Sequence, residues 1–191
     1  RNAGSQPLSY TVSLLPDHFG VWRSDEPDGP AVAWTEPPAD AVTIPLEDDG
    51  ASAPLPLGFP FPYRGERYER GYVSANGLIS LEPLPPDGVP FARSCLPASE
   101  TSGAAIVPLR LDLDPSKPGA RVSYASLPEG FLLTWENVPL YNDSAARLSF
   151  QTLLMPDGRI SMRYRTLSPL SPAESASYGL QYGLREVQAL G

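Results

Sequence analysis

Prolines and glycines divide this chain into apolar runs that are too short for helices. The 191 residues include 24 prolines and 16 glycines, and the densest example is residues 55–81 (LPLGFPFPYRGERYERGYVSANGLISL). Proline is excluded from helix interiors and from central positions of sheets. No long segment repeats its apolar residues with a helical period. The chain is therefore predicted to consist of short strands, sheet edges and turns.

Two turn sequences predict hairpins. Asn76-Gly77 and Pro156-Asp157-Gly158 each lie between two β-rich runs. Asn-Gly favours a two-residue type I′ turn, because both residues tolerate positive φ. Short β-rich runs recur along the rest of the chain at the spacing of a sandwich or barrel. We therefore predict an all-β fold, an antiparallel β-sandwich of jelly-roll character with long Pro/Ser-rich loops.

The length predicts one domain over residues 1–191, because a single all-β domain can reach about 200–250 residues. A hydrophobic fraction of 41% is enough for a packed core. Turn-rich sequence separates residues 1–18 from the remainder, so residues 19–191 are predicted to form the core and residues 1–18 an N-terminal strand segment.

The N-terminal segment contains one β-rich run, SYTVSLL, which places Tyr10, Val12 and Leu14 on one face. A strand this apolar needs a partner. It either pairs within its own sheet or adds to the exposed sheet edge of a neighbouring copy, as in donor-strand complementation. The second arrangement predicts oligomers or filaments of this chain.

The charge of the chain excludes some partners. The formal net charge is -8, the only lysine is Lys117, and the arginines are scattered. Nucleic-acid binding requires basic patches that displace phosphate counterions, so nucleic acid is not an expected partner. No apolar run reaches the ~20 residues of a membrane span. The chain begins without Met or a signal peptide, and is expected to be a processed or excised piece.

Catalysis is not expected. The single cysteine, Cys95, is interpreted as a buried thiol, with an intermolecular disulfide as the alternative. A nucleophilic Cys or Ser needs a nearby base, and the single histidine, His18, lies far from Cys95 in the sequence. The Gly-x-Ser-x-Gly motif, the zinc motifs and the phosphate loops are absent. A carboxylate pair for glycoside hydrolysis could be read into almost any acidic β-protein.

The best candidate metal site is Asp112-Leu113-Asp114. Alternate residues of a strand point the same way, so Asp112 and Asp114 would share a face. Ca²⁺ takes about 6–8 oxygen ligands. Three further acidic residues could complete such a site: Asp48, Asp49 and Glu136. The alternative is a solvated strand end in which Asp114 caps the turn at Pro115, with no cofactor at all.

Two tryptophans are candidates for stacking on sugars. Trp22 and Trp34 lie among turn sequences and are expected to be exposed, whereas Trp135 follows an apolar run and is expected in the core. An exposed aromatic pair would favour a carbohydrate-binding module.

Five segments resemble one known family in the same order. The family pattern is LPFGFPF, YVSSNGxLSF, IAPFWDDLDPS, VxWxNVP and FQxxLxxDGxI. The matching segments are residues 57–61, 72–81, 106–116, 133–139 and 150–160. The chain thus resembles the nidogen-like or plexin-domain-like extracellular β-domain of large secreted bacterial proteins. Where the family has FWDDLD, residues 109–114 read LRLDLD, so the resemblance itself carries no metal role.

The resemblance implies a β-sandwich accessory module without catalytic residues, often beside subtilisin-like proteases or adhesins at the cell surface. We therefore predict a secreted or cell-surface, non-catalytic structural or adhesion module that can self-assemble by strand addition. Its expected partners are copies of itself or neighbouring domains of a larger surface protein. The alternatives are a carbohydrate-binding module and an accessory domain of a secreted protease.

Overall fold

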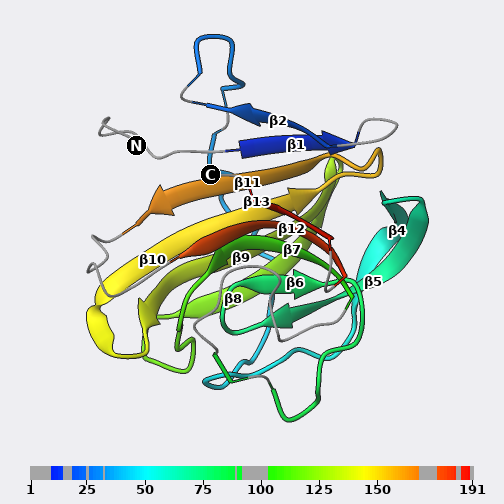
Figure 1. The fold of residues 1–191 in the computed structure, drawn as a ribbon. Helices are drawn as coiled ribbons and strands as arrows, with labels where there is room; N and C mark the ends of the chain where they lie inside the picture. Colours follow the sequence, from blue (N-terminus) through cyan, green and yellow to red (C-terminus); the bar gives the residue numbers. More distant parts are fainter. Residues whose placement is uncertain are drawn as a thin grey trace.

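In the described part of the chain, thirteen strands form two antiparallel sheets (Figure 1). The computed structural model describes residues 10–14, 19–24, 26–31, 33–88, 90–91, 103–167, 176–183 and 186–189. These residues contain no helix that is long and apolar enough to cross a membrane. The predicted all-β, antiparallel sandwich is confirmed.

The larger sheet has seven strands in the order β2-β1-β11-β10-β9-β8-β3. Long neighbouring strands in its centre are joined by short turns, as the predicted hairpins require. In chain order its strands are β1 (Tyr10–Leu14), β2 (Phe19–Arg23), β3 (Val42–Thr43), β8 (Arg121–Leu127), β9 (Gly130–Leu140), β10 (Asp143–Leu154) and β11 (Ile160–Thr166).

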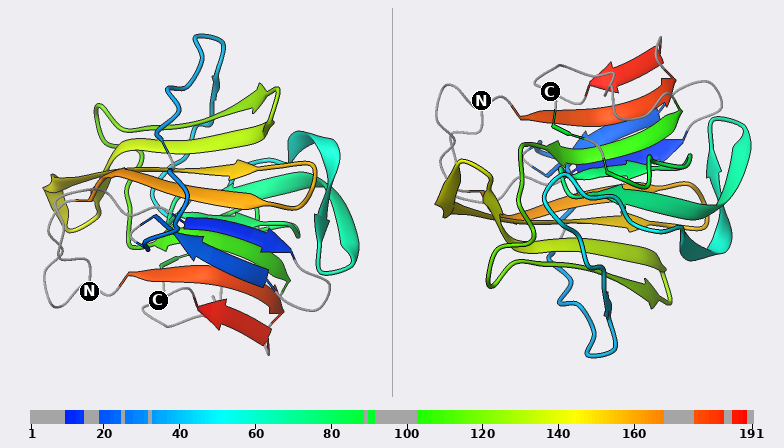
Figure 2. Two further views of the ribbon diagram at one scale, coloured as in Figure 1. Left: turned by 90° about the horizontal axis from the view of Figure 1, so that it is seen from above. Right: turned by 90° about the horizontal axis from the view of Figure 1, so that it is seen from below.

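The smaller sheet has six strands in the order β13-β12-β7-β6-β5-β4. In chain order they are β4 (Leu55–Tyr63), β5 (Glu66–Ser74), β6 (Leu78–Ser80), β7 (Ala104–Arg110), β12 (Ser177–Gly183) and β13 (Glu186–Ala189). The β4–β5 hairpin curves away from its sheet and lies across one end of the sandwich (Figure 2). The hydroxyl of Tyr63 ties it down, lying 3.0 Å from both the Ala105 and Gln181 carbonyl oxygens.

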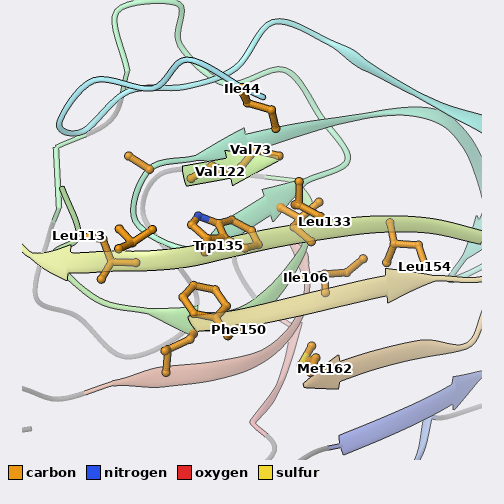
Figure 3. Close-up of a cluster of buried hydrophobic side chains, with 14 of the residues drawn as sticks. Ile44, Val73, Ile106, Leu113, Val122, Leu133, Trp135, Phe150, Leu154 and Met162 are labelled. Atoms are coloured by element: carbon orange, nitrogen blue, oxygen red, sulfur yellow. The ribbon is translucent and has the colours of Figure 1, made fainter. Parts of the chain in front are cut away.

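The core lies between the two sheets and centres on an aromatic pair. Trp135 of β9 and Phe150 of β10 are cross-strand partners, and their rings stack with centroids 4.8 Å apart (Figure 3). Both are fully buried, which confirms Trp135 as a core residue. Burying a large apolar side chain contributes about 1.5–3 kcal/mol, so this cluster is a main source of stability.

Both predicted hairpins form, but their turns have three residues. Ser74 pairs with Leu78, and the Gly77 N–H donates to the Ser74 carbonyl at 3.2 Å. Of Asn76 and Gly77, only Gly77 has positive φ, at 77°. This is a type I turn followed by a left-handed glycine, so the type I′ prediction is wrong. Tertiary hydrogen bonds of the Asn76 side chain, given below, account for the difference.

The N-terminal strand lies inside the larger sheet. β1 pairs with β2 on one side and β11 on the other, with Val12 in register with both Val21 and Ile160. In one chain it therefore takes the first of the two predicted arrangements. Exchange of this strand between copies would use the same pairing and stays a prediction. The side chains of Tyr10, Val12 and Leu14, and all of His18 and Cys95, lie outside the part of the chain that the structure describes.

Candidate functional site

Three carboxylates from two distant segments meet at one end of the sandwich. Asp48 and Asp49 lie in the turn before Gly50, and Asp112 follows the end of β7. Each offers one oxygen, and these oxygens all lie within 4.8 Å of one another. We call Asp48, Asp49 and Asp112 the acidic cluster.

Asn76 positions the cluster from the β5–β6 turn. Its side chain is almost fully buried. Its Nδ2 donates to Asp49 Oδ1 at 2.7 Å, and its Oδ1 accepts from the Leu113 N–H at 2.8 Å. The Phe91 N–H also donates to Asp49 Oδ1, at 2.9 Å. Asn76 thus links both acidic segments, which explains why the turn departs from the type I′ form.

The charge of the cluster is poorly compensated at Asp48. Burial raises the pKa of the Asp48 carboxyl, and the neighbouring carboxylates of Asp49, Asp114 and Asp112 raise it further. The Oδ1 atom of Asp48 is enclosed and has no hydrogen-bond partner among the described residues. A buried carboxylate oxygen without a partner is costly, and a bound cation or a proton would relieve it.

Asp114 is directed to other partners. The Lys117 ammonium lies 2.7 Å from its Oδ2, and the Ser116 N–H and hydroxyl both donate to its Oδ1. Burial alone would raise the pKa of Asp114, but these hydrogen bonds outweigh it and hold the pKa below its ordinary value. This is the turn-capping role given as the alternative for Asp114. Glu136 instead accepts a hydrogen bond from the Arg165 guanidinium.

The predicted pair of sugar-stacking tryptophans is not an exposed platform. Trp22 is 40% exposed on β2, as expected. Trp34 is half-buried, and the Arg165 guanidinium lies 4.3 Å from its ring centroid. Gln151 holds the segment next to Trp34 against the sheet, accepting from the Thr35 N–H at 2.9 Å and donating to the Thr35 carbonyl at 3.0 Å. Figure 2 shows this segment crossing the larger sheet. The prediction that Trp34 is exposed is therefore wrong.

A groove beside the β4–β5 hairpin was not predicted. It has a volume of about 510 Å³ and is lined in part by Tyr68, Arg70 and Tyr72 of β5 and by Glu82. Burial raises the pKa of Tyr68, and the nearby Glu82 and Glu66 add to the shift. The alternation of Tyr, Arg and Tyr along one strand was the available signal, because alternate residues share a face.

The acidic cluster offers carboxylate oxygens. Such oxygens can coordinate a cation or bind a proton.

Comparison with known proteins assigns the family. Residues 31–190 match the model of the NIDO-related family. Nidogen-2 of Mus musculus is 26% identical over 185 aligned positions, which span 79% of this chain but 12% of the mouse protein. The chain thus spans about an eighth of the length of that relative. No solved structure gives a match. Because the family match covers most of the sandwich, the chain belongs to the NIDO-related, nidogen-like family of domains.

Proposed function

We propose that the chain is a non-catalytic, extracellular structural or adhesion module of a larger protein. The family match over residues 31–190 carries this proposal. The small share of nidogen-2 that the chain covers supports a module rather than a whole protein. Its partners would be neighbouring domains or further copies of the chain.

A binding assay tests the proposal. The domain is immobilised and presented with flanking domains of its own parent protein and with soluble copies of itself. Saturable binding to either supports the proposal. A hydrolytic activity that remains proportional to the pure domain through every purification step would overturn it. An accessory role beside a secreted protease predicts instead that only the protease domain binds.

We also propose that the acidic cluster binds Ca²⁺. Asp48, Asp49 and Asp112 supply three side-chain ligands from two segments, and backbone carbonyls and water would supply the remainder of the about 6–8 oxygens. The unpaired Asp48 Oδ1 and the raised pKa of Asp48 support a cation rather than a simple solvated surface. The ion would join the Asp48–Asp49 turn to the strand that precedes Asp112, and so stiffen this end of the sandwich.

Calorimetric titration tests the ion directly. Wild-type protein freed of metal is titrated with CaCl₂ and, separately, MgCl₂. We expect one Ca²⁺ site and a rise in melting temperature that EDTA reverses. Asp48→Asn and Asp112→Asn should lose both effects, whereas Glu36→Gln, at a carboxylate paired with Arg165, should keep them. No heat and no melting shift in the wild type would contradict the proposal.

A further inference from the structure

The two sheets have four edge strands, and three of them are poor partners for another strand. β4 carries Pro56, Pro60 and Pro62, which cannot donate backbone hydrogen bonds to a neighbour. β3 has two residues and β13 has four. Prolines and short lengths are the usual protection of sheet edges.

The fourth edge, β2, has no such protection. Its sequence, FGVWR, contains no proline and no charge before Arg23. β2 is the edge strand of the larger sheet next to β1 (Figure 1). Among the described residues, Gly20, Val21 and Trp22 make no backbone hydrogen bond outside the β1 ladder. Trp22 is also one of the few large apolar side chains that are exposed among the described residues.

The sequence of β2 is complementary to itself. Val21 is its central residue, with Gly20 and Trp22 on either side. If two copies of β2 pair antiparallel about Val21, each Trp22 stands opposite Gly20 of the other copy. In the single chain the Trp22 ring lies over the α-carbon of Gly20 in its own strand, since a Cβ there would lie 2.4 Å from the ring. In the pair the same ring would turn onto Gly20 of the other copy. An aromatic ring over a glycine in an edge strand is a stabilising cross-strand pair.

We propose that β2 is a self-association edge, along which two copies of this chain pair antiparallel about a two-fold axis at Val21. The larger sheets of the two copies then form one continuous sheet. A two-fold contact uses the same patch on both copies and closes at a dimer. A five-residue strand pair is a small interface, so association is weak in solution and strengthened when copies are tethered in a larger assembly.

Sedimentation across a concentration series tests the edge. Wild-type residues 1–191 should pass from monomer to dimer as concentration rises. Trp22→Lys places a charge in the edge and should weaken the dimer by about tenfold or more. Val42→Lys, on the two-residue edge β3, is the matched control, because Val42 is also exposed. It should dimerise like the wild type. A melting curve of each variant shows whether it is folded.

Disulfide trapping tests the register. Residues directly opposite each other in antiparallel strands have Cα atoms about 4.5–5.5 Å apart, which suits a disulfide. Val21→Cys in a Cys95→Ser background should therefore give a covalent dimer on mild oxidation. Val42→Cys in the same background should not. Equal trapping of both variants, or a dimer that Trp22→Lys leaves unchanged, would overturn the proposal, as would a monomer at every concentration.

The self-association edge rests on the proposed structural role but fails separately from it. A protein that binds its neighbouring domains yet stays monomeric disproves the β2 contact and leaves the adhesion module standing. Exchange of β1 is also distinguishable. It would give a dimer that Trp22→Lys does not weaken and that Val21→Cys does not trap.

Discussion

Lys117 and Asp114 form an ion pair at 2.7 Å between Nζ and Oδ2, in which the carboxylate is nearly buried and the lysine is 44% exposed. The pair occupies one carboxylate oxygen of Asp114, which would otherwise be open to a cation. Because Lys117 and Ser116 satisfy Asp114, the acidic cluster reduces to Asp48, Asp49 and Asp112.

Removing the lysine should destabilise the protein in a pH-dependent way. Asp114 has a folded-state pKa below its ordinary 3.8, so it stabilises the fold above pH 3.8 and loses this contribution as the pH falls through the folded pKa. Lys117→Met should therefore lower the melting temperature at pH 7 and have little effect at the lowest accessible pH. Melting curves of both proteins from pH 7 downwards check this. A difference that is the same at all pH values would contradict it.

Asp48 should behave in the opposite way. Its folded-state pKa is raised above 3.8, so its ionised form destabilises the fold above that pKa, and the penalty disappears as the pH falls below 3.8. Without metal, Asp48→Asn should therefore raise the melting temperature at pH 7. With saturating CaCl₂ the wild type should be the more stable protein. The control is Asp87→Asn, at an exposed carboxylate. A variant that is less stable in EDTA would contradict the cause assigned to the shift.

Two glycines with similar positive φ angles should respond differently to alanine. Gly77 has φ 77°, and a Cβ there would lie 1.9 Å from the Leu109 carbonyl oxygen. Gly65 has φ 86° and nothing within 4 Å of such a Cβ. Gly65→Ala should cost only the left-handed strain, about 1–2 kcal/mol. Gly77→Ala should cost clearly more, because the backbone must also move. Urea unfolding of both variants measures the difference, and equal costs would show that the close approach to Leu109 is unimportant.

Two substitutions of Trp135 should separate the contribution of its packing from the cost of its buried indole N–H. Trp135→Ala leaves a cavity against Phe150 and should cost about 3–5 kcal/mol. Trp135→Phe leaves a smaller cavity and removes an indole N–H that is buried without a partner among the described residues. Relief of an unsatisfied donor offsets part of the lost packing, so Trp135→Phe should cost markedly less. Chemical denaturation gives both values. A cost for Phe close to that for Ala would mean that the indole N–H is in fact satisfied.

Gln151 should prove essential for the segment that crosses the larger sheet. Gln151→Met keeps the volume but leaves the Thr35 N–H and carbonyl without partners, and should cost about 1–3 kcal/mol. Hydrogen exchange at Thr35 should accelerate by more than the change in global stability explains. Ser126→Ala, at an exposed position of β8, is the control and should change neither quantity.

Local patterns predicted the sandwich well, because strands, turns and core residues are encoded within a few neighbouring residues. The β5–β6 hairpin follows from Asn76-Gly77, but its turn type does not. The Asn76 side chain forms hydrogen bonds with Asp49 and Leu113, which are distant in the sequence. The pattern gave the presence of the turn, and tertiary contacts decided its form.

The candidate site was predicted in part for the same reason. Alternation drew attention to Asp112 and Asp114, and Asp48 and Asp49 were expected as additional ligands. Asp114 and Lys117 are only three positions apart in the sequence, so their ion pair could have been predicted from the sequence. The shielding of Trp34 could not have been predicted, because Arg165 lies on β11, far from Trp34 in the sequence. The groove beside Tyr68 depends on where Glu82 lies in space.

The hydrogen bonds between Thr35 and Gln151 join positions 116 residues apart. Thr35 comes early in the chain, but its partner exists only after β10 has been added to the sheet. We therefore expect the segment next to Thr35 to dock late in folding, after the central hairpins have formed. A contact of such long range is expected to slow folding, since a long loop has to close before any bond compensates for it. By the same reasoning, the segment would be among the first parts to detach when the folded protein opens locally.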